Sequence, residues 1–323
     1  MTRVLVTGAT GFIGRALCEI LAGRGYVVRA ALRADQTLPP WIAERAVVGD
    51  IGGATDWEAA LTGVELVVHA AARAHLLDDA RKGAQLYFET NGNGTHRLAQ
   101  EAAKAGVRRF VYVSSVKVNG ERCIGRAFGP LDPPAPQDAY SASKWRGESF
   151  LAEVTARSSM SAAIVRPPLV YGPGVRANFL RLLTWVDGGW PLPFGSVRNR
   201  RSLVSVWNLC DLLVRLLIHP AGRGGVWMVS DGDDLSTAEL VRHIATAMGK
   251  QISLLPVPVA VLRVAAGMFG RAGEIERLCG SLFVDITHTR CELGWTPPVS
   301  VDEGLARTVA WYRSGHKRAP AGS

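Results

Sequence analysis

Short apolar runs alternate with longer segments of helical spacing along the first third of the chain. The first run, Val4 to Val6, leads into a glycine-rich turn, and a helix-compatible stretch follows from Arg15 to Gly23. Strands that alternate with helices in this way pair in parallel, so the pattern predicts an α/β fold built on a doubly wound parallel sheet. Further strands are predicted at residues 27–32, 47–51, 64–69 and 107–115, and helices at residues 75–90 and from about 91–95 to 105.

The second half of the chain continues this alternation and then becomes mainly helical. A strand at 204–206, a helix at 208–218 and a strand at 226–230 are predicted to return to the sheet. Ser236 and Glu239 then predict a helix start with a capping box. The most apolar stretch, 252–269, contains two prolines and an arginine, which argues against a membrane span. It predicts a buried helix or a helix of a second domain, and a helix lying on a membrane surface is the alternative.

The glycine-rich turn has the sequence Thr7-Gly8-Ala9-Thr10-Gly11-Phe12-Ile13-Gly14. Gly8 permits a tight turn, Gly11 lets a ligand approach the backbone, and Gly14 lets the helix pack closely on the strand. The N-terminus of the helix offers free N–H groups and a partial positive charge to phosphates. This arrangement predicts a site for the pyrophosphate of a dinucleotide.

Composition and charge narrow the class of protein. The 323 residues are 48% hydrophobic and 20% charged, as in ordinary soluble enzymes, and 37 basic against 28 acidic side chains give a net charge of +9. The basic residues are scattered, so they favour anionic small molecules and predict no nucleic-acid partner. The five cysteines lack paired spacing, which predicts free thiols and no metal site. The start of the chain has no signal-peptide pattern, so we expect a cytoplasmic protein without an integral membrane span.

The residues that carry chemistry follow the strand predicted at 107–115. Ser115 ends that strand, and Tyr140 and Lys144 are spaced four residues apart, which places them on one face of a helix. Free tyrosine has a pKa of about 10, and we expect the Lys144 ammonium to lower it so that the phenol serves as acid and base. Ser115 is then placed to hold the reacting oxygen.

The end of the second predicted strand bears on the type of dinucleotide. An acidic residue at this place binds the ribose hydroxyls of NAD, but here the strand is followed by Arg33. Since an arginine attracts a 2′-phosphate, the sequence favours NADP(H) with Arg33 as the contact, and NAD(H) is the alternative. Asp50 is placed to reach the adenine amino group. The small residues 70–72 follow the fourth strand and leave room for a ligand.

The glycine motif, Asp50, Asn91, Ser115 and the pair Tyr140-x-x-x-Lys144 together resemble an extended short-chain dehydrogenase/reductase of the NAD-dependent epimerase/dehydratase family. Residues 166–174 and 285–295, the latter ending in Leu-Gly-Trp, extend the resemblance over nearly the whole chain. It implies that Tyr140 is the acid and base, that Lys144 binds the nicotinamide ribose and that Asn91 supports the cofactor region. The cofactor-binding residues expected on these grounds are Gly8, Thr10, Gly11, Phe12, Ile13, Gly14, Arg33, Asp50, Ile51, Ala70, Ala71, Ala72, Asn91, Val113, Tyr140, Lys144, Arg166 and Pro167.

Members of this family commonly act on nucleotide sugars, so the resemblance implies a UDP-sugar substrate. Asn178 and Arg201 match positions that contact the substrate phosphates in that subset, and Arg277 is a third candidate. The 4,6-dehydratases of the family carry an acidic pair just after the catalytic hydroxyl residue, where this chain has Val116 and Lys117. That difference argues against a dehydratase.

Two reactions at C4 of a UDP-hexose remain. The sequence favours reduction of a UDP-4-keto-6-deoxy-HexNAc, as in the reductases that complete UDP-N-acetylquinovosamine for bacterial surface polysaccharide. The second strand lacks the acid expected for tightly held NAD, and Lys117 and Asn119 depart from the common epimerase pattern. One alternative is a UDP-glucose or UDP-GlcNAc 4-epimerase with retained NAD. Another, a non-catalytic NADP-sensing scaffold, is opposed by the intact Ser115, Tyr140 and Lys144.

The resemblance also divides the chain into two parts. It implies a Rossmann cofactor domain over 1–170 plus about 203–231, a smaller substrate-binding domain over 171–202 and 232–312, and a tail at 313–323. We expect the sugar to bind between the two domains, at the carboxyl ends of the parallel strands. Related enzymes usually pair through helices near Tyr140, so a homodimer is expected.

Overall fold

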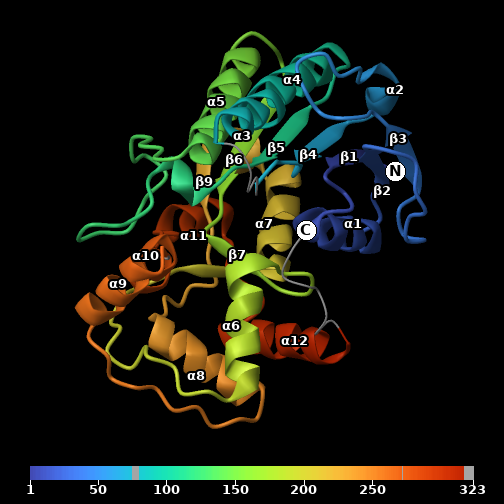
Figure 1. The fold of residues 1–323 in the computed structure, drawn as a ribbon. Helices are drawn as coiled ribbons and strands as arrows, with labels where there is room; N and C mark the ends of the chain where they lie inside the picture. The colour runs from blue at the N-terminus through green and yellow to red at the C-terminus, as the bar shows by residue number, and fades with distance from the viewer. Residues whose placement is uncertain (75–79, 271, 316–323) are drawn as a thin grey trace.

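A seven-stranded parallel sheet forms the centre of the fold (Figure 1). The structure is a computed structural model that describes residues 1–74, 80–270 and 272–315. The strands of this sheet are β1 (Arg3–Thr7), β2 (Val27–Leu32), β3 (Glu44–Val47), β4 (Leu66–His69), β5 (Arg109–Val113), β6 (Ser161–Arg166) and β9 (Val226–Met228). Their order is β3-β2-β1-β4-β5-β6-β9, and every neighbouring pair is parallel.

Helices cover both faces of this sheet, so the predicted doubly wound α/β fold is confirmed (Figure 1). The helices of these layers are α1 (Phe12–Gly23), α2 (Glu58–Leu61), α3 (Ala80–Tyr87), α4 (Gly94–Lys104), α5 (Ala139–Thr155), α7 (Val206–Ile218) and α11 (Thr287–Leu293), with 3₁₀ turns η2 (Val116–Val118) and η3 (Pro220–Arg223). Side chains alternate along a strand: Val4 and Val6 share a core with α1 and α7, and Leu5 packs on the opposite face with α4 and α5. This two-sided burial explains why the strands read as continuous apolar runs.

A second group of helices packs below the sheet in Figure 1 around a core of its own. Its elements are α6 (Ala177–Gly188), α8 (Thr237–Ala247), α9 (Val259–Met268), α10 (Ala272–Cys279) and α12 (Val301–Arg313). A two-stranded parallel sheet, β7 (Leu169–Tyr171) and β8 (Leu203–Ser205), lies at the border with the first group. There the buried Tyr171 hydroxyl donates to Asp231, at 2.7 Å, and ties β7 to the segment after β9.

Two of the predicted strands differ from the structure. The strand expected at 47–51 ends instead at Val47, because Gly49 takes a left-handed φ of +73° and turns the chain. The strand expected at 204–206 lies in the two-stranded sheet, although α7 and β9 after it do return to the central layers. The predicted capping box of α8 is confirmed: the Ser236 hydroxyl accepts from the Glu239 amide, at 3.1 Å, and the Glu239 carboxylate accepts from the Ser236 amide, at 2.8 Å.

The helix around Asn91 is continuous and does not start anew there. α3 runs into a π-helical turn, η1 (Phe88–Asn93), which runs directly into α4. The predicted helix start at 91–95 is therefore wrong, and the first part of the predicted helix, 75–79, lies outside the described residues. A π-helical turn widens the helix by one residue and is often found at functional sites. Here it turns the Asn91 side chain toward α5, as described below.

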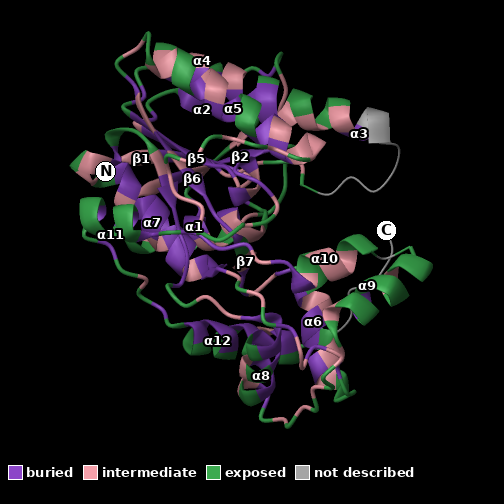
Figure 2. Cartoon of the chain, turned by 90° about the vertical axis from the view of Figure 1, so that its left-hand side faces the viewer, coloured by how far each residue is buried: buried purple, intermediate pink, exposed green. Residues whose placement is uncertain are grey.

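The apolar stretch 252–269 was expected to form a buried helix or a helix of a second domain, and it forms a helix of the second group that is largely exposed. Only residues from Val259 onward are helical, and Leu262 is the one buried residue of α9 (Figure 2). Among the described residues, no helix combines the length and the apolar character needed to cross a bilayer. Of the predicted tail 313–323, Arg313 is the last residue of α12, and the last eight residues lie outside the described part of the chain.

Candidate functional site

The glycine turn after β1 is packed so tightly that only glycine fits at two of its positions. Gly8 has a left-handed φ of +68°, and a Cβ at this position would lie 2.8 Å from the amide nitrogen of Ala71. A Cβ at Gly14 would lie 2.0 Å from the Gly8 carbonyl oxygen. The turn is thereby pressed against α1 on one side and against the small residues after β4 on the other. It leaves the N-terminus of α1 open to an anion such as a pyrophosphate.

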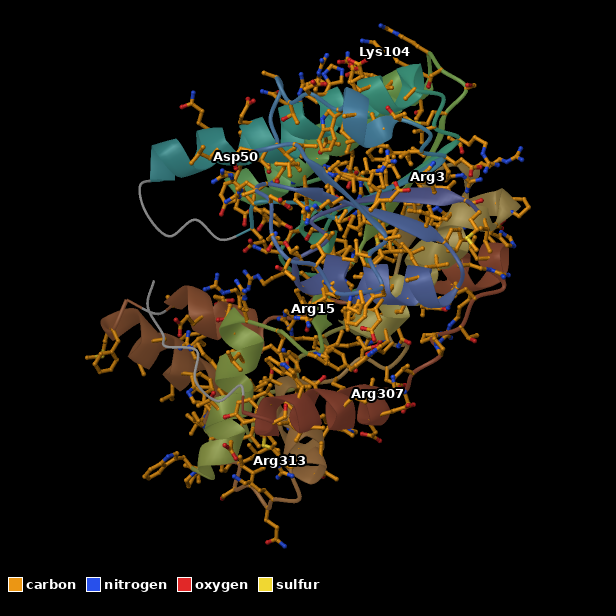
Figure 3. The ribbon with its side chains drawn as sticks, turned by 90° about the vertical axis from the view of Figure 1, so that its right-hand side faces the viewer. Arg3, Arg15, Asp50, Lys104, Arg307 and Arg313 are labelled. Carbon is orange, nitrogen blue, oxygen red and sulfur yellow. The ribbon has the colours of Figure 1, made fainter. Side chains whose placement is uncertain are left out.

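Charged side chains gather where the strands end, next to this turn. Figure 3 shows Asp50, which follows β3, at the end of the sheet opposite to Arg3, the first residue of β1. Arg33 Nε lies 2.9 Å from Asp50 Oδ1, and Arg73 Nη2 lies 3.6 Å from the same oxygen. Asp50 therefore faces two guanidinium groups, and the two residues predicted to contact the adenosine half of a dinucleotide form an ion pair.

The predicted catalytic residues Ser115, Tyr140 and Lys144 come from the end of β5 and the first turns of α5. Ser115 caps the 3₁₀ turn η2, where its hydroxyl accepts from the Lys117 amide at 3.2 Å. Asp138 caps α5, and its carboxylate accepts from the Ser141 amide at 2.6 Å. These two caps fix the start of each segment and bring the Ser115 hydroxyl close enough to the Tyr140 phenol to influence its pKa.

The electrostatics of Tyr140 and Lys144 differ from the expectation. Burial raises the pKa of Tyr140 to about 12, although the hydrogen bond with Ser115 acts to lower it. Burial lowers the pKa of Lys144 to about 7, and the charge of Glu148 raises it in part. Lys144 Nζ lies 4.1 Å from the ring centroid of Tyr112 and has no hydrogen-bond partner among the described residues. The pKa of the phenol is therefore raised and not lowered as expected, because desolvation outweighs the hydrogen bond with Ser115.

Asn91 connects the loop after β4 to the catalytic helix. Its buried side-chain amide accepts from the Arg73 amide at 2.9 Å and donates to the Arg73 carbonyl and to Ser143 Oγ, both at 3.0 Å. Ser143 directly precedes Lys144 in α5. Asn91 therefore holds the loop and the catalytic helix in one fixed arrangement.

Lys117, for which no role was predicted, links the serine segment to the catalytic helix. Its ammonium donates to Glu121 at 2.8 Å and to Asp138, the cap of α5, at 2.9 Å. Burial lowers the pKa of Lys117, but the hydrogen bonds to both carboxylates outweigh this and the net shift is upward. Lys117 is thus a cation that positions the start of the Tyr140 helix relative to Ser115.

A buried histidine, which sequence reasoning missed, lies beneath the site. His69 Nδ1 lies 2.6 Å from the Thr7 hydroxyl, and His69 Nε2 lies 3.0 Å from the Thr95 hydroxyl. The Thr95 hydroxyl donates to the Asn91 carbonyl at 2.7 Å, so it accepts from His69 Nε2–H, and Nδ1 accepts from Thr7. Burial, and more weakly the charge of Lys144, lowers the pKa of His69 to about 3. A neutral histidine therefore connects the end of β1 to the π-helical turn.

A second buried network lies behind Ser115. Arg166 donates to both oxygens of Glu148, with Nε–Oε1 and Nη2–Oε2 distances of 3.0 and 2.5 Å, and to Asn119 Oδ1 at 3.1 Å. The Ser114 hydroxyl donates to Glu148 at 2.5 Å. The Arg166 side chain is thus occupied by a structural ion pair. The Pro167 carbonyl accepts from the Val116 amide at 3.0 Å and supports the serine turn.

The predicted substrate contacts lie in the second group of helices. Asn178 is exposed in the first turn of α6, next to the N-cap Arg176. The Arg201 guanidinium donates to the carbonyl groups of Arg277 and Gly280 at the end of α10, and Arg277 itself is exposed. Arg201 and Arg277 therefore lie close together, as expected for two phosphate contacts. The Arg201 guanidinium, however, makes its hydrogen bonds to backbone carbonyl groups of the protein.

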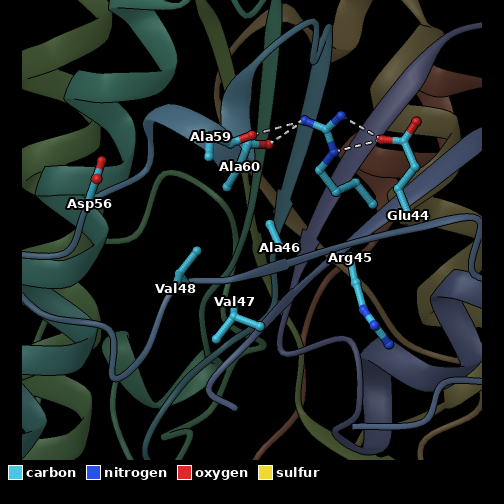
Figure 4. A pocket seen from close by; sticks show the side chains of 9 residues that line it. Glu44, Arg45, Ala46, Val47, Val48, Asp56, Ala59 and Ala60 are labelled. Atoms are coloured by element: carbon cyan, nitrogen blue, oxygen red, sulfur yellow. Dashed lines mark hydrogen bonds and ion pairs between the residues drawn. The ribbon is translucent and has the colours of Figure 1, made fainter. Parts of the chain in front are cut away.

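A pocket at the edge of the sheet lies apart from these residues. In it, Arg29 donates to Glu44 and to backbone carbonyls of α2 (Figure 4). Its lining consists of Arg29, Glu44, Arg45, Ala46, Val47, Val48, Asp56, Ala59 and Ala60, and contains none of the predicted site residues. Within the described ranges, no group of three or more histidine, cysteine, aspartate or glutamate side chains is arranged to hold a metal ion.

Comparison with known proteins agrees with this geometry. Residues 4–229 match the NAD dependent epimerase/dehydratase family. A UDP-glucose 4-epimerase of Vibrio cholerae is 43% identical over 319 residues, which cover 98% of this chain and 97% of that protein. A dTDP-glucose 4,6-dehydratase of Streptomyces griseus is 31% identical, covering 100% of this chain and 98% of that protein.

A solved structure gives the same answer for the fold. MoeE5 in complex with UDP-glucose and NAD matches with a TM-score of 0.78 and 26% identity over 97% of this chain and 99% of that one. The resemblance to extended short-chain dehydrogenases/reductases is therefore confirmed. The chain belongs to the NAD dependent epimerase/dehydratase family and is an enzyme of the short-chain dehydrogenase/reductase type.

Proposed function

We propose that this chain is a UDP-hexose 4-epimerase that works with a retained NAD. The observation that carries the proposal is the meeting of the Ser115 hydroxyl and the Tyr140 phenol beside the buried Lys144. This set serves oxidation and reduction at a sugar carbon equally well, so the choice between reactions rests on relatives. The Vibrio cholerae relative, similar over nearly its full length, is described as an epimerase, which favours epimerisation over the 4-keto reduction favoured by the sequence alone.

The residues present fit the dinucleotide. The glycine turn admits no side chain between α1 and the strand ends, which suits a pyrophosphate at the helix N-terminus. Lys144 Nζ is a buried donor that has no hydrogen-bond partner within residues 1–74, 80–270 and 272–315, and a ribose diol is the kind of group that would satisfy it. When bound, NAD supplies the acceptor and donor of hydride.

Proton movement is the part of the reaction that the chain performs. Tyr140 accepts the proton of the C4 hydroxyl during oxidation and returns it to the C4 oxygen after the keto sugar has turned over. Ser115 holds that oxygen in line with the phenol. Because burial raises the pKa of Tyr140 to about 12, the phenol needs positive charge nearby to act as a base. Lys144, one helical turn away, supplies this charge in its protonated form, whose pKa burial lowers to about 7.

The residues after Ser115 oppose dehydration. Val116 is buried and apolar, and the Lys117 ammonium is held by Glu121 and Asp138. Elimination of water from the sugar needs a carboxylic acid at this place, and neither residue supplies one. The chain is 31% identical to a dTDP-glucose 4,6-dehydratase, but it lacks the acidic pair expected for that reaction.

We propose NAD rather than NADP as the cofactor. Arg33 was predicted to bind a 2′-phosphate, but its guanidinium lies 2.9 Å from the Asp50 carboxylate. A 2′-phosphate at this place would have to compete with the Asp50 carboxylate for the Arg33 guanidinium, and it would be repelled by that carboxylate. The description of MoeE5 with NAD supports the same choice.

We further propose that the two groups of helices bind different ligands and that the protein forms a dimer. Residues 1–170 and about 203–231 hold the cofactor, and residues 171–202 and 232–312 hold the UDP-sugar. Trp145 on α5 is 37% exposed and Leu86 on α3 is 41% exposed, which supports pairing of two copies through the helices near Tyr140. Light scattering of the purified protein tests the dimer. The free thiols of all five cysteines suit a reducing compartment such as the cytoplasm.

The two candidate reactions are separated by one pair of incubations followed by NMR. UDP-glucose and UDP-GlcNAc are supplied without added reductant, and UDP-2-acetamido-2,6-dideoxy-4-hexulose is supplied with NADPH or NADH. Epimerisation predicts the galacto isomer in the first incubation, with no change in nicotinamide absorbance. Consumption of the reduced nicotinamide only with the keto sugar would establish the reductase.

A further inference from the structure

An apolar face of α9 points to solvent instead of into the protein. Val261, Val264 and Met268 follow one another at intervals of three and four residues, which places them on one side of the helix. They are 54%, 67% and 80% exposed, and Phe269 after the helix is 79% exposed. A surface helix usually packs its apolar side chains against the core of the protein. The apolar side chains of α9 face the solvent instead, which is unusual for a surface that binds nothing.

A second exposed apolar segment lies next to α9. Ile124 and Leu131, in the loop between η2 and α5, are 94% and 96% exposed. The loop is nevertheless well anchored: the Cys123 amide donates to the Ser281 carbonyl at 2.9 Å, and the Phe128 amide donates to the Phe283 carbonyl at 2.9 Å. These side chains are therefore held out into solvent by a fixed backbone.

One carboxylate joins the two segments. Glu276 of α10 accepts from Arg122, in the loop, at 3.1 Å and pairs with Arg263 of α9 at 2.8 Å. In Figure 1 the loop and α9 project from the same side of the molecule. We call the set Ile124, Leu131, Val261, Val264, Met268 and Phe269 the apolar ridge.

The charges around the ridge are nearly balanced, with a small excess of cations. Arg122 and Arg263 share the carboxylate of Glu276, and Arg126 pairs with Asp132, so three arginines face two carboxylates. The chain as a whole carries a net charge of +9. Apolar side chains beside arginines are the pattern of segments that lie in the headgroup region of an anionic bilayer, where each cation near the surface contributes about 1 kcal/mol.

The shape of the ridge also favours a lipid layer over a folded protein. Side chains exposed over more than nine-tenths, such as Ile124 and Leu131, have few neighbours that could shape a complementary pocket, whereas a fluid acyl layer needs no such match. α9 spans ten residues, or about 15 Å, which is half the thickness of a hydrocarbon core. It is long enough to lie on a bilayer and too short to cross one.

We propose that the protein docks reversibly on anionic membrane surfaces through the apolar ridge. α9 packs against α10, whose last turn contacts the predicted phosphate-binding residue Arg201. Docking through the ridge therefore places the substrate side of the enzyme close to the lipid surface. The proposal does not depend on the reaction, because binding to vesicles requires no turnover.

Vesicle flotation tests the proposal with the full-length chain. Vesicles of phosphatidylcholine alone and of equal parts phosphatidylcholine and phosphatidylglycerol are mixed with the protein at low and high salt. We expect flotation with the anionic vesicles at low salt, reduced by salt, and a loss of at least about tenfold in partitioning for the double variant Met268→Ser/Phe269→Ser. Ile218→Ser on α7, where Ile218 is 60% exposed away from the ridge, is the matched control and should float like the wild type.

Several results would overturn the proposal. One is a wild type that stays at the bottom of the gradient with anionic vesicles, and another is a double variant that floats as well as the wild type. Light scattering without vesicles distinguishes a protein partner: a dimer that the same double variant dissociates would make the ridge an interface between copies. Both variants change exposed side chains, so thermal melting should be unchanged, and this checks that each is folded.

Discussion

Replacing Gly14 by alanine tests the packing on which the cofactor turn depends. The new Cβ would lie 2.0 Å from the carbonyl oxygen of Gly8, 2.6 Å from its carbonyl carbon and 2.9 Å from the Cα of Ala9. These neighbours are backbone atoms, which cannot rotate away as a side chain can. α1 must therefore move outward from β1, and the Gly8–Gly11 turn must move with it.

The same helix provides the control. Gly23 is also in α1, and a Cβ at Gly23 would meet nothing within 4 Å. Alanine is favoured over glycine by up to about 1 kcal/mol in a helix, so Gly23→Ala should be neutral or slightly stabilising. Overpacking costs about 1–3 kcal/mol, so Gly14→Ala should be less stable than Gly23→Ala by about that amount.

Urea unfolding and NAD binding by calorimetry measure the two consequences separately. We expect Gly14→Ala to have a lower unfolding midpoint and an affinity for NAD reduced at least about tenfold, which is about 1.4 kcal/mol. Gly23→Ala should bind NAD like the wild type. Equal stability and equal NAD affinity of the two variants would refute the close contact between α1 and the glycine turn.

Three further predictions concern the residues around the site. Tyr140→Phe should lower kcat by about 10²- to 10⁴-fold while NAD still binds, and a variant that keeps full activity would remove the phenol from the chemistry. Lys117→Met should lower kcat about three- to tenfold. The change in stability should be small, because the ion pair with Asp138 is partly exposed. Lys117→Arg should keep most of the wild-type kcat, and equal rates for both variants would contradict the positioning role. His69 stays neutral in the folded protein down to about pH 3, but in the unfolded chain it takes up a proton below about pH 6.5. As the pH is lowered from about 6.5 to about 3, the free energy of unfolding should therefore fall by up to about 1.4 kcal/mol per pH unit. Urea titrations at pH 7 and pH 5 should show a smaller difference for His69→Gln, and an unchanged difference would exclude His69 as the cause.

Local patterns in the sequence were enough to predict most of the central fold. The glycine turn, the strand at Val27–Leu32 and the capping box at Ser236 and Glu239 all depend on residues close together in the chain. The positions of Ser115, two residues after β5, and of Tyr140, in the first turn of α5, follow from the same kind of pattern. These features are determined by spacing and backbone geometry, which a single sequence displays directly.

Features that depend on distant partners were not predictable in this way. Residues 203–205 have a strand-like composition, but their partner is β7 and not a strand of the central sheet. The role of Lys117 depends on Asp138, 21 residues later, and that of His69 on hydroxyl groups of Thr7 and Thr95. A histidine that ends a buried strand was the one available signal for the last of these.

The exposure of α9 could not be read from its sequence either, because an apolar helix looks alike whether it faces a core or the solvent. The pKa values of Tyr140 and Lys144 likewise depend on how deeply folding buries both groups. Opposite charge and desolvation act against each other, and only the fold decides which is larger.

The central claim is that hydrogen leaves C4 of a UDP-hexose and returns to the same carbon within one enzyme complex. UDP-glucose labelled with deuterium at C4 tests this directly when it is incubated with the protein without added reductant and followed by NMR. We predict UDP-galactose that keeps the deuterium at C4, formed about 10²- to 10⁴-fold more slowly with Tyr140→Phe. Loss of the label to solvent or to free nicotinamide, or the absence of any galacto product, would contradict the account.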